Sequence, residues 1–248
     1  GEPVLYLDES TLRDPTKSVR GGVPLLLPIA GRLDGDGWTH EGTRYAMRQH
    51  GFGRTLPWSL AEQRADDGGA SVTLRLEDGE TTRALYPFGF VFEARYVLAD
   101  GALTLTLTVT CTEGGPMPVH VGTHPYLHID RATKSAARVD TDATRAWDNV
   151  ARREVTLAGL PDLGAGEVDL HLLDHGPRET VLHRPGARDV RLAWSENLTT
   201  LVVWTLPERD FVCVEPWSSL AGAFERGDAA RVATGESASW WWSIGLAT

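Results

Sequence analysis

The segment Ala102 to Thr110 reads ALTLTLTVT, and no other part of the chain limits the fold as strongly. Its leucines and valine alternate with threonines, which is the period of two expected of a β-strand with one buried face. The dipeptide Asp100-Gly101 precedes this segment, and such a pair accepts positive φ in a tight turn. Because the aromatic run Phe88 to Val97 comes just before it, the sequence predicts an antiparallel hairpin.

Strand-like runs recur along the chain and are separated by many of its 26 glycines and 14 prolines. They cover residues 71–76, 117–123, 180–183, 190–194, 198–206, 211–214 and 237–246. No segment keeps the apolar i, i+3, i+4, i+7 spacing of a long helix. The sequence therefore predicts an all-β fold, a large antiparallel β-sandwich built by a single domain over residues 1–248. In the last run, Trp240, Trp242 and Ile244 share one face and are expected to pack in the core.

The composition argues against several kinds of partner. A formal net charge of −10 and a pI near 5.3 give no basic face for a nucleic acid or an anionic membrane surface. No apolar run approaches the roughly 20 residues of a membrane helix, and Gly1 to Asp8 carry no secretory signal pattern. Cys111 and Cys213 are too few for a disulfide framework, so two buried thiols and a cytoplasmic location are expected.

The segment PVHVGTHPY places His120 and His124 on the same face of an extended strand. One interpretation is a metal site formed by these two residues and His128, but no HExxH pattern or cysteine partner supports it, so no metal is predicted. In a second interpretation, Pro125 ends the strand and leaves the His124 imidazole over a cleft, where it can transfer protons near neutral pH. A structural, hydrogen-bonded histidine is the third interpretation.

Glu215 follows the apolar run FVCV and precedes Pro216 and Trp217. Its carboxylate therefore leaves an apolar strand beside a large indole, and burial against Trp217 would raise the pKa of this carboxyl group and make it a stronger base. A solvated carboxylate at the end of a strand is the alternative. Neither His124 nor Glu215 carries a functional assignment alone, and only their combination suggests acid–base chemistry.

Five segments follow one another in a recognisable order: RGGVPLLLPIAGRL (20–33), QHGFGRTLPW (49–58), MPVHVGTHPYLHI (117–129), VCVEPW (212–217) and TGESASWWWSIGL (234–246). They resemble the GG-x-P…GR, HGFAR, G-x-HPYF and EPW motifs and the closing PGE…W strand of the galactose mutarotase superfamily. The similarity is greatest to the bacterial branch of aldose 1-epimerase-like proteins that includes the LacX group. The resemblance implies a galactose mutarotase-like β-sandwich for nearly the whole chain. Relatives carry further strands before the first motif, where this chain has only residues 1–20, so trimming and a deletion both stay open.

The resemblance also implies roles for individual residues. His124 takes the position of the general acid and Glu215 that of the general base, while Arg32 and His50 take positions that bind sugar hydroxyls. Asp169 matches a further sugar ligand, although the family's Asp-x-x-Phe pattern has leucine here in place of phenylalanine. Trp217 or Trp58 is expected either to stack on the apolar face of a pyranose or to pack in the core.

One acid and one base suffice to open and close a hemiacetal, so no cofactor is expected. The predicted function is that of an aldose 1-epimerase, or mutarotase, an isomerase that interconverts the α and β anomers of a hexose, acting as a monomer or homodimer. One alternative is a hexose-6-phosphate mutarotase, for which Arg20, Arg48 and Arg54 are candidate phosphate ligands. Another is a sugar-binding or sensor protein without catalysis. A glycosidase would need two catalytic carboxylates that flank the bond, and only Glu215 is nominated for a catalytic role.

Overall fold

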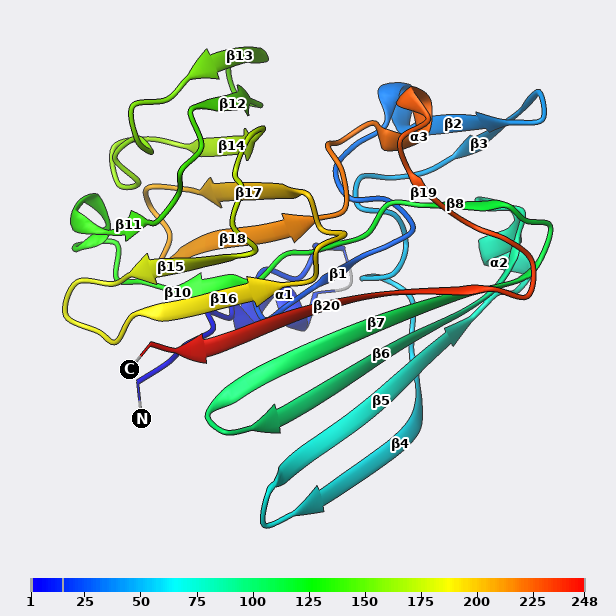
Figure 1. Ribbon diagram of the computed structural model, residues 1–248, viewed down its shortest axis with the longest axis horizontal. Coiled ribbons are helices and arrows are strands. Elements are labelled where there is room, and N and C mark those ends of the chain that lie inside the picture. The colour runs from blue at the N-terminus through cyan, green and yellow to red at the C-terminus, as the bar shows by residue number, and fades with distance from the viewer. Residues whose placement is uncertain (1, 15, 248) are drawn as a thin grey trace. The chain divides into compact units, whose positions relative to one another are not determined.

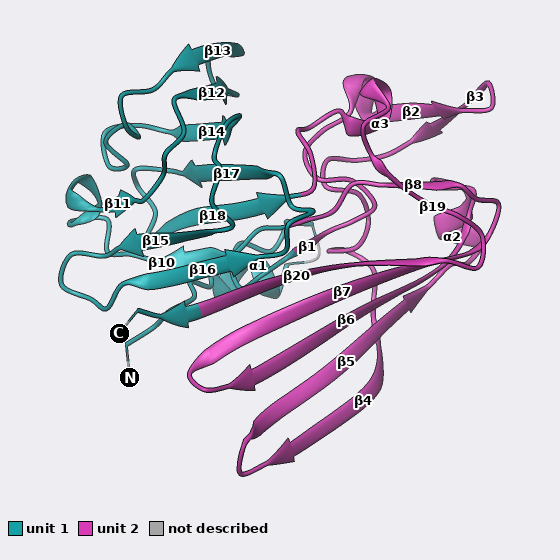
Figure 2. Ribbon diagram, in the orientation of Figure 1, with its two compact units in different colours: residues 1–24, 123–217, 245–248 teal, residues 25–122, 218–244 magenta. Residues whose placement is uncertain are grey.

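The computed structural model describes residues 2–14 and 16–247 (Figure 1). The chain forms two compact units (Figure 2). Unit 1 comprises residues 1–24, 123–217 and 245–248, and unit 2 comprises residues 25–122 and 218–244. The units are interleaved in sequence, and a single domain over the whole chain stays a prediction.

Unit 1 contains two antiparallel runs of strands, in the orders β10-β18-β17-β14-β12-β13 and β11-β15-β16. Its helices are single turns. The elements are α1 (Glu9–Leu12), β10 (Tyr126–His128), the 3-10 turn η2 (Lys134–Ala136), β11 (Arg138–Val139), β12 (Arg145–Asp148), β13 (Arg153–Thr156), β14 (Val168–Leu172), β15 (Glu179–His183), β16 (Val190–Trp194), β17 (Thr200–Thr205) and β18 (Phe211–Trp217).

Unit 2 is built around the antiparallel run β20-β7-β6-β5-β4, and the pairs β19-β8 and β2-β3 accompany it. Two short strands, β1 (Leu25–Leu26) and β9 (Gly122–Thr123), lie where the chain passes between the units. The other elements are η1 (Asp34–Asp36), β2 (Gly37–His40), β3 (Thr43–Ala46), β4 (Ser59–Asp66), β5 (Gly69–Glu77), α2 (Glu80–Arg83), β6 (Gly89–Ala99), β7 (Ala102–Glu113), β8 (Met117–Val119), α3 (Ala223–Arg226), β19 (Ala230–Val232) and β20 (Ser237–Leu246).

The hairpin predicted from the alternating segment is confirmed as β6 and β7, which pair from Ala99 opposite Ala102 onward. Asp100 and Gly101 both have positive φ, +51° and +73°, as a tight hairpin turn requires. On β7, the side chains of Leu105, Leu107 and Val109 are buried, and that of Leu103 is half-buried. The threonine side chains of β7 lie on its other face. There the Thr108 hydroxyl is 3.0 Å from the Ser239 hydroxyl on the neighbouring strand β20. Alternation of leucine and threonine thus separates a core face from a hydroxyl-bonded face.

The predicted strands at 190–194 and 237–246 coincide with β16 and β20. Trp240, Trp242 and Ile244 are buried, as expected, whereas the intervening Trp241 is 40% exposed. Strand β4 was not predicted, because all eight of its residues are exposed and their polarity does not alternate. The short strands β2, β3, β12 and β13 were missed for the same reason: each lacks a continuous buried face.

Two of the sequence motifs in unit 2 meet through backbone contacts at Gly51. The Leu27 carbonyl accepts hydrogen bonds from the amides of Phe52 and Gly53, at 2.9 Å and 3.0 Å. Gly51 has φ +64°, and a Cβ at this position would overlap the Leu27 carbonyl oxygen. Only glycine meets both demands, so the first glycine of the QHGFGRTLPW segment, Gly51, is explained by backbone packing.

We predict that Gly51→Ala lowers the free energy of unfolding by about 2–4 kcal/mol, because it combines positive-φ strain with a backbone clash. Gly42→Ala is the matched control: Gly42 also has positive φ, +80°, but a Cβ added there would have nothing within 4 Å. Its cost should be limited to strain, about 1 kcal/mol. Urea unfolding of both variants measures the difference, and equal losses would contradict the packing explanation.

Candidate functional site

The register of four strands in unit 1, β14, β17, β18 and β10, brings polar side chains to one face. Residues directly opposite one another in antiparallel strands point to the same side, as do residues two apart in one strand. The face opposite is apolar, with Leu170, Val203 and Val214 all buried. Two rows cross the polar face: Asp169, Trp204, Cys213 and Tyr126 form one, and His171, Val202 and Glu215 form the other.

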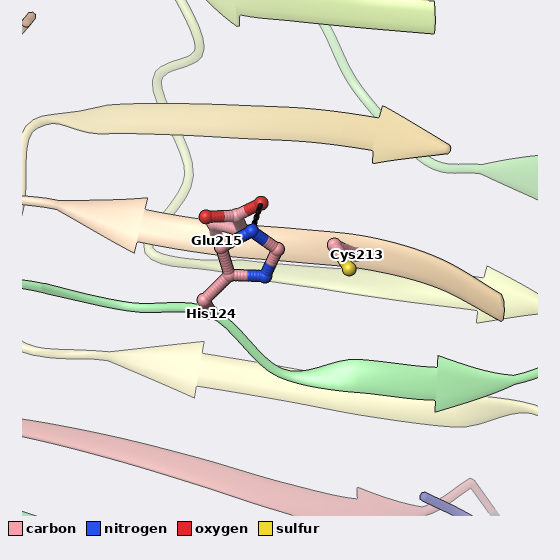
Figure 3. A group of neighbouring side chains, drawn as sticks. All are labelled: His124, Cys213 and Glu215. Atoms are coloured by element: carbon pink, nitrogen blue, oxygen red, sulfur yellow. Dashed lines mark ion pairs between the residues drawn. The ribbon is translucent and has the colours of Figure 1, made fainter. Parts of the chain in front are cut away.

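His124 and Glu215 lie against one another in this unit (Figure 3). The His124 Nε2 atom is 3.5 Å from Glu215 Oε1, and the side chains are only 9% and 2% exposed. His124 follows the two-residue strand β9, and its backbone amide donates to the Pro24 carbonyl at 3.0 Å. The imidazole stacks on Tyr126, with ring centroids 4.7 Å apart, and meets the edge of Trp204 at 5.4 Å. Two aromatic rings therefore fix its orientation.

Glu215 lies within β18, whose seven residues are all buried, so the sequence expectation of a carboxylate at a strand end is corrected. The Trp217 indole donates its Nε1 hydrogen to Glu215 Oε2 at 3.2 Å. Trp217 itself is 3% exposed, and its ring meets the edge of His171 at 5.0 Å. Because Oε2 is held by the indole, Oε1 is the oxygen that faces His124.

Asp169 lies on β14 in the same face, and two side chains hold its carboxylate. Asn149 donates its Nδ2 hydrogen to Asp169 Oδ2 at 2.8 Å, and His171 Nε2 lies 3.4 Å from Oδ1. The Asp169 side chain keeps 20% of its surface exposed. A chain of contacts through His171 and Trp217 thus connects Asp169 with Glu215.

Cys213 completes the group drawn in Figure 3. It is fully buried beside Tyr126 and Phe211, and burial raises the pKa of its thiol well above the usual range, with a further contribution from Glu215. One ligand atom each from His124, Cys213 and Glu215 lie within 4.8 Å of one another, so these three residues could hold a metal ion. The metal site considered in the sequence used a different set, His120, His124 and His128. The structure places His120 in unit 2, where its Nε2 is 2.8 Å from the Ser219 carbonyl oxygen.

Arg32 and His50 both belong to unit 2. His50 is buried and has φ +66°, and its Nδ1 accepts the Gly31 amide hydrogen at 3.0 Å, which leaves the proton of a neutral ring on Nε2. Arg32 follows Gly31 directly, but its guanidinium is exposed and lies 3.4 Å from Asp36. The sugar-binding roles of both residues stay predictions. Of the candidates in the sequence, the structure groups His124, Glu215, Trp217 and Asp169 in unit 1.

Several residues of the site were missed by sequence reasoning. Cys213 and His171 are each two residues from a nominated carboxylate on a strand, so the period of two was a usable signal for both. Asn149 gives no such signal, because it lies 20 residues from Asp169 and only strand pairing brings it close.

Comparison with known proteins gives the family. A family model described as aldose 1-epimerase matches residues 10–244, which is nearly the whole chain. The chain belongs to the aldose 1-epimerase family. A crystal structure of the Slr1438 protein from Synechocystis is 32% identical, covers 100% of this chain and 86% of that chain, and has a TM-score of 0.95. That of a galactose mutarotase related enzyme from Lactobacillus acidophilus is 23% identical, covers 91% and 83%, and has a TM-score of 0.76.

Two sequence relatives are named "Putative glucose-6-phosphate 1-epimerase". The one from Salmonella typhimurium is 34% identical over 128 residues, which is 52% of this chain and 39% of that protein. The one from Cenchrus ciliaris is 27% identical over 239 residues, which is 87% of this chain and 69% of that protein. The match therefore spans well under half of the length of the Salmonella relative.

The predicted all-β antiparallel sandwich of the aldose 1-epimerase family is confirmed by the sheets of the structure and by these neighbours. Within residues 2–14 and 16–247, no helix is long and apolar enough to cross a membrane.

A buried lysine supports the loop that leads into the β18 strand of the site. Lys134 is 0% exposed, and its ammonium donates to the Thr205 hydroxyl at 3.0 Å and to the carbonyls of Leu206, at 2.9 Å, and Arg209. It thus ties together the two ends of the β17–β18 connection. Burial lowers the pKa of Lys134 from 10.5 to about 8.

We predict that Lys134→Met lowers the free energy of unfolding by about 2–4 kcal/mol, because buried acceptors lose their donor.

Since the pKa of Lys134 is lower in the folded than in the unfolded chain, the unfolded chain binds more protons between about pH 8 and pH 10.5. As the pH rises from about 8 to 10.5, the free energy of unfolding of the wild type should therefore increase relative to that of Lys134→Met. Urea unfolding of both proteins below pH 8 and near pH 10.5 measures this change. The exposed control Lys17→Met should change stability by less than about 0.5 kcal/mol. A difference that shrinks with rising pH would contradict the assignment.

Proposed function

We propose that this chain is a cofactor-independent aldose 1-epimerase that interconverts the anomers of a hexose. The observation that carries the proposal is the buried contact between His124 Nε2 and Glu215 Oε1, 3.5 Å apart. Ring opening needs a proton removed from the C1 hydroxyl and a proton added to the ring oxygen, and both oxygens are bonded to the same carbon. An acid and a base that lie this close can therefore serve one anomeric centre.

In the proposed reaction, Glu215 Oε1 takes the proton of the C1 hydroxyl while His124 Nε2 donates a proton to the ring oxygen. The bond between C1 and the ring oxygen breaks and leaves an open-chain aldehyde. Rotation about the bond between C1 and C2 presents the other carbonyl face. The reverse transfers then close the ring, so that each residue regains its starting protonation state and no electrons leave or enter the sugar.

The neighbours of the pair support this division of roles. Trp217 donates to Glu215 Oε2, which fixes the carboxylate with Oε1 toward His124. Because Trp217 is 3% exposed, this hydrogen bond is favoured over the alternative of stacking on a sugar. Asp169, held by Asn149 and partly exposed, has the acceptor oxygens that a sugar hydroxyl needs. The roles of Arg32 and His50 as sugar ligands rest on the family resemblance.

Other parts of the assignment stay predictions: no cofactor, a monosaccharide as the substrate, a monomer or homodimer, and a cytoplasmic location.

The non-catalytic alternative, a sugar-binding or sensor protein, makes a distinct claim. Such a protein would bind a hexose without accelerating the exchange of its anomers, so one polarimetric measurement separates the two.

We predict that Glu215→Gln and His124→Ala each reduce mutarotation of fresh α-glucose or α-galactose by about 10²–10⁴-fold, the usual contribution of a positioned acid or base. Polarimetry measures the rate above the spontaneous one. The exposed Glu154→Gln on β13 and the half-buried His40→Gln on β2 are controls of the same residue types and should keep the wild-type rate. Wild-type rates in either site variant, with the fold intact by circular dichroism, would overturn the proposal.

A phosphorylated hexose is the second candidate substrate, and Arg20 favours it. Its guanidinium carbon lies 5.9 Å from the Trp204 ring centroid, and Trp204 meets the edge of the His124 imidazole. Among residues 2–14 and 16–247, no carboxylate forms an ion pair with Arg20, so its charge is available to an anion. The names of the Salmonella and Cenchrus relatives agree with a 6-phosphate. Arg48 and Arg54, the other phosphate candidates, belong to unit 2.

We predict that Arg20→Gln lowers kcat/KM for glucose 6-phosphate by about 10–100-fold, the value of one charge-assisted contact. The rate with unphosphorylated glucose should change less than twofold. Arg209→Gln is the matched control, because Arg209 is ion-paired with Asp8 at 3.6 Å and has a partner already. If both substrates lose activity equally, Arg20 does not recognise the phosphate.

A further inference from the structure

Cys213 has no part in the proposed reaction, yet it faces the same side of β18 as the proposed base. It lies two residues before Glu215, and its thiol is within 4.8 Å of a ligand atom of His124 and of Glu215. In Figure 3 the three side chains lie together along β18 and the segment that carries His124. An imidazole nitrogen, a thiolate sulfur and a carboxylate oxygen are the three donor types found in zinc sites.

The distances suit a tetrahedral ion after a small adjustment. With metal–ligand bonds of about 2.0–2.3 Å, the ligand atoms of a zinc site lie about 3.4–3.6 Å apart. His124 Nε2 and Glu215 Oε1 are already 3.5 Å apart. The widest pair of the cluster, at no more than 4.8 Å, needs to close by about 1 Å, which rotation of the Cys213 thiol and the imidazole can supply.

The surroundings also suit a divalent cation. The Trp217 indole donates a hydrogen bond to Glu215 Oε2, and a hydrogen bond of this kind orients a carboxylate ligand of a metal. A thiolate and a carboxylate together balance the two charges of the ion. Three protein ligands leave a fourth position, which a water molecule can occupy.

We propose that His124, Cys213 and Glu215 form a binding site for a thiophilic divalent cation of the zinc class, and that its occupation inhibits mutarotation. On binding, the Cys213 thiol releases its proton to solvent and the sulfur forms a bond to the metal, with no change in oxidation state. The bound metal occupies both His124 Nε2 and Glu215 Oε1, the atoms that would transfer protons to and from the sugar. The inhibition rests on the proposed function, whereas the binding itself does not.

The binding is tested by titrating the chelator-treated full-length chain with Co²⁺ or Cd²⁺ and recording the sulfur-to-metal charge-transfer absorption. The chain has two cysteines, and both are free and buried, so each serves as the control for the other. Cys111→Ser should keep the absorption with one metal per chain, because its remaining thiol is Cys213. Cys213→Ser should lose the absorption and bind Zn²⁺ at least about 100-fold more weakly.

Cys111→Ser keeps the proposal testable even if Cys213→Ser does not fold. Absence of the absorption in folded Cys111→Ser, or its persistence in folded Cys213→Ser, overturns the site. Mutarotation by the wild type should fall in proportion to the occupied fraction and recover on chelation. If the metal binds and activity is unchanged, the inhibitory role is wrong. If the chain shows no mutarotation even without metal, the proposed function fails while the absorption still decides the metal site.

Discussion

The pairing register of β17 with β18 is the constraint on which the candidate site depends. Val202 opposite Glu215 and Trp204 opposite Cys213 place the carboxylate and the thiol on the face that also carries Asp169 and His171. A shift of β18 by one residue against β17 would turn Glu215 and Cys213 to the other side of the sheet, where Val203 and Val214 are buried. Burial of the apolar residues on that side therefore determines the register, and the register determines where the polar side chains of the site lie.

Burial of Glu215 is costly unless its oxygens have partners, because an isolated carboxylate in an apolar interior is strongly disfavoured. The Trp217 indole, two residues along the same strand, meets part of this need, and His124 lies against the other oxygen. The EPW segment thus contains both the carboxylate and its own hydrogen-bond donor. At the other end of β18, Lys134 fixes the loop from which the strand starts.

The sequence allowed the strongly alternating strands and the β6–β7 hairpin to be predicted, because each leaves a local pattern. His124 and Glu215 were nominated together on the family resemblance that the ordered motifs carry, because neither is persuasive from its local pattern alone. It did not allow β4 to be predicted, whose exposed residues carry no alternation. It also left open whether Glu215 is buried or solvated, because that depends on neighbouring strands. The contact of Asn149 with Asp169 depends on pairing between β12 and β14 and has no local signature. Lys134 also escaped notice, since a lysine in a polar segment is ordinarily exposed.

The proposed acid and base lie in contact with one another, and this has a consequence for the affinity expected of the proposed enzyme. In the proposed reaction, a sugar hydroxyl would replace the interaction between His124 and Glu215, so ground-state binding would gain less than it would from two unpaired groups. Weak binding would suit the proposed mutarotase, whose substrate and product are two anomers of one sugar, because neither anomer would be retained. Rapid exchange of the ligand, rather than tight recognition, is the behaviour that such a preformed pair favours.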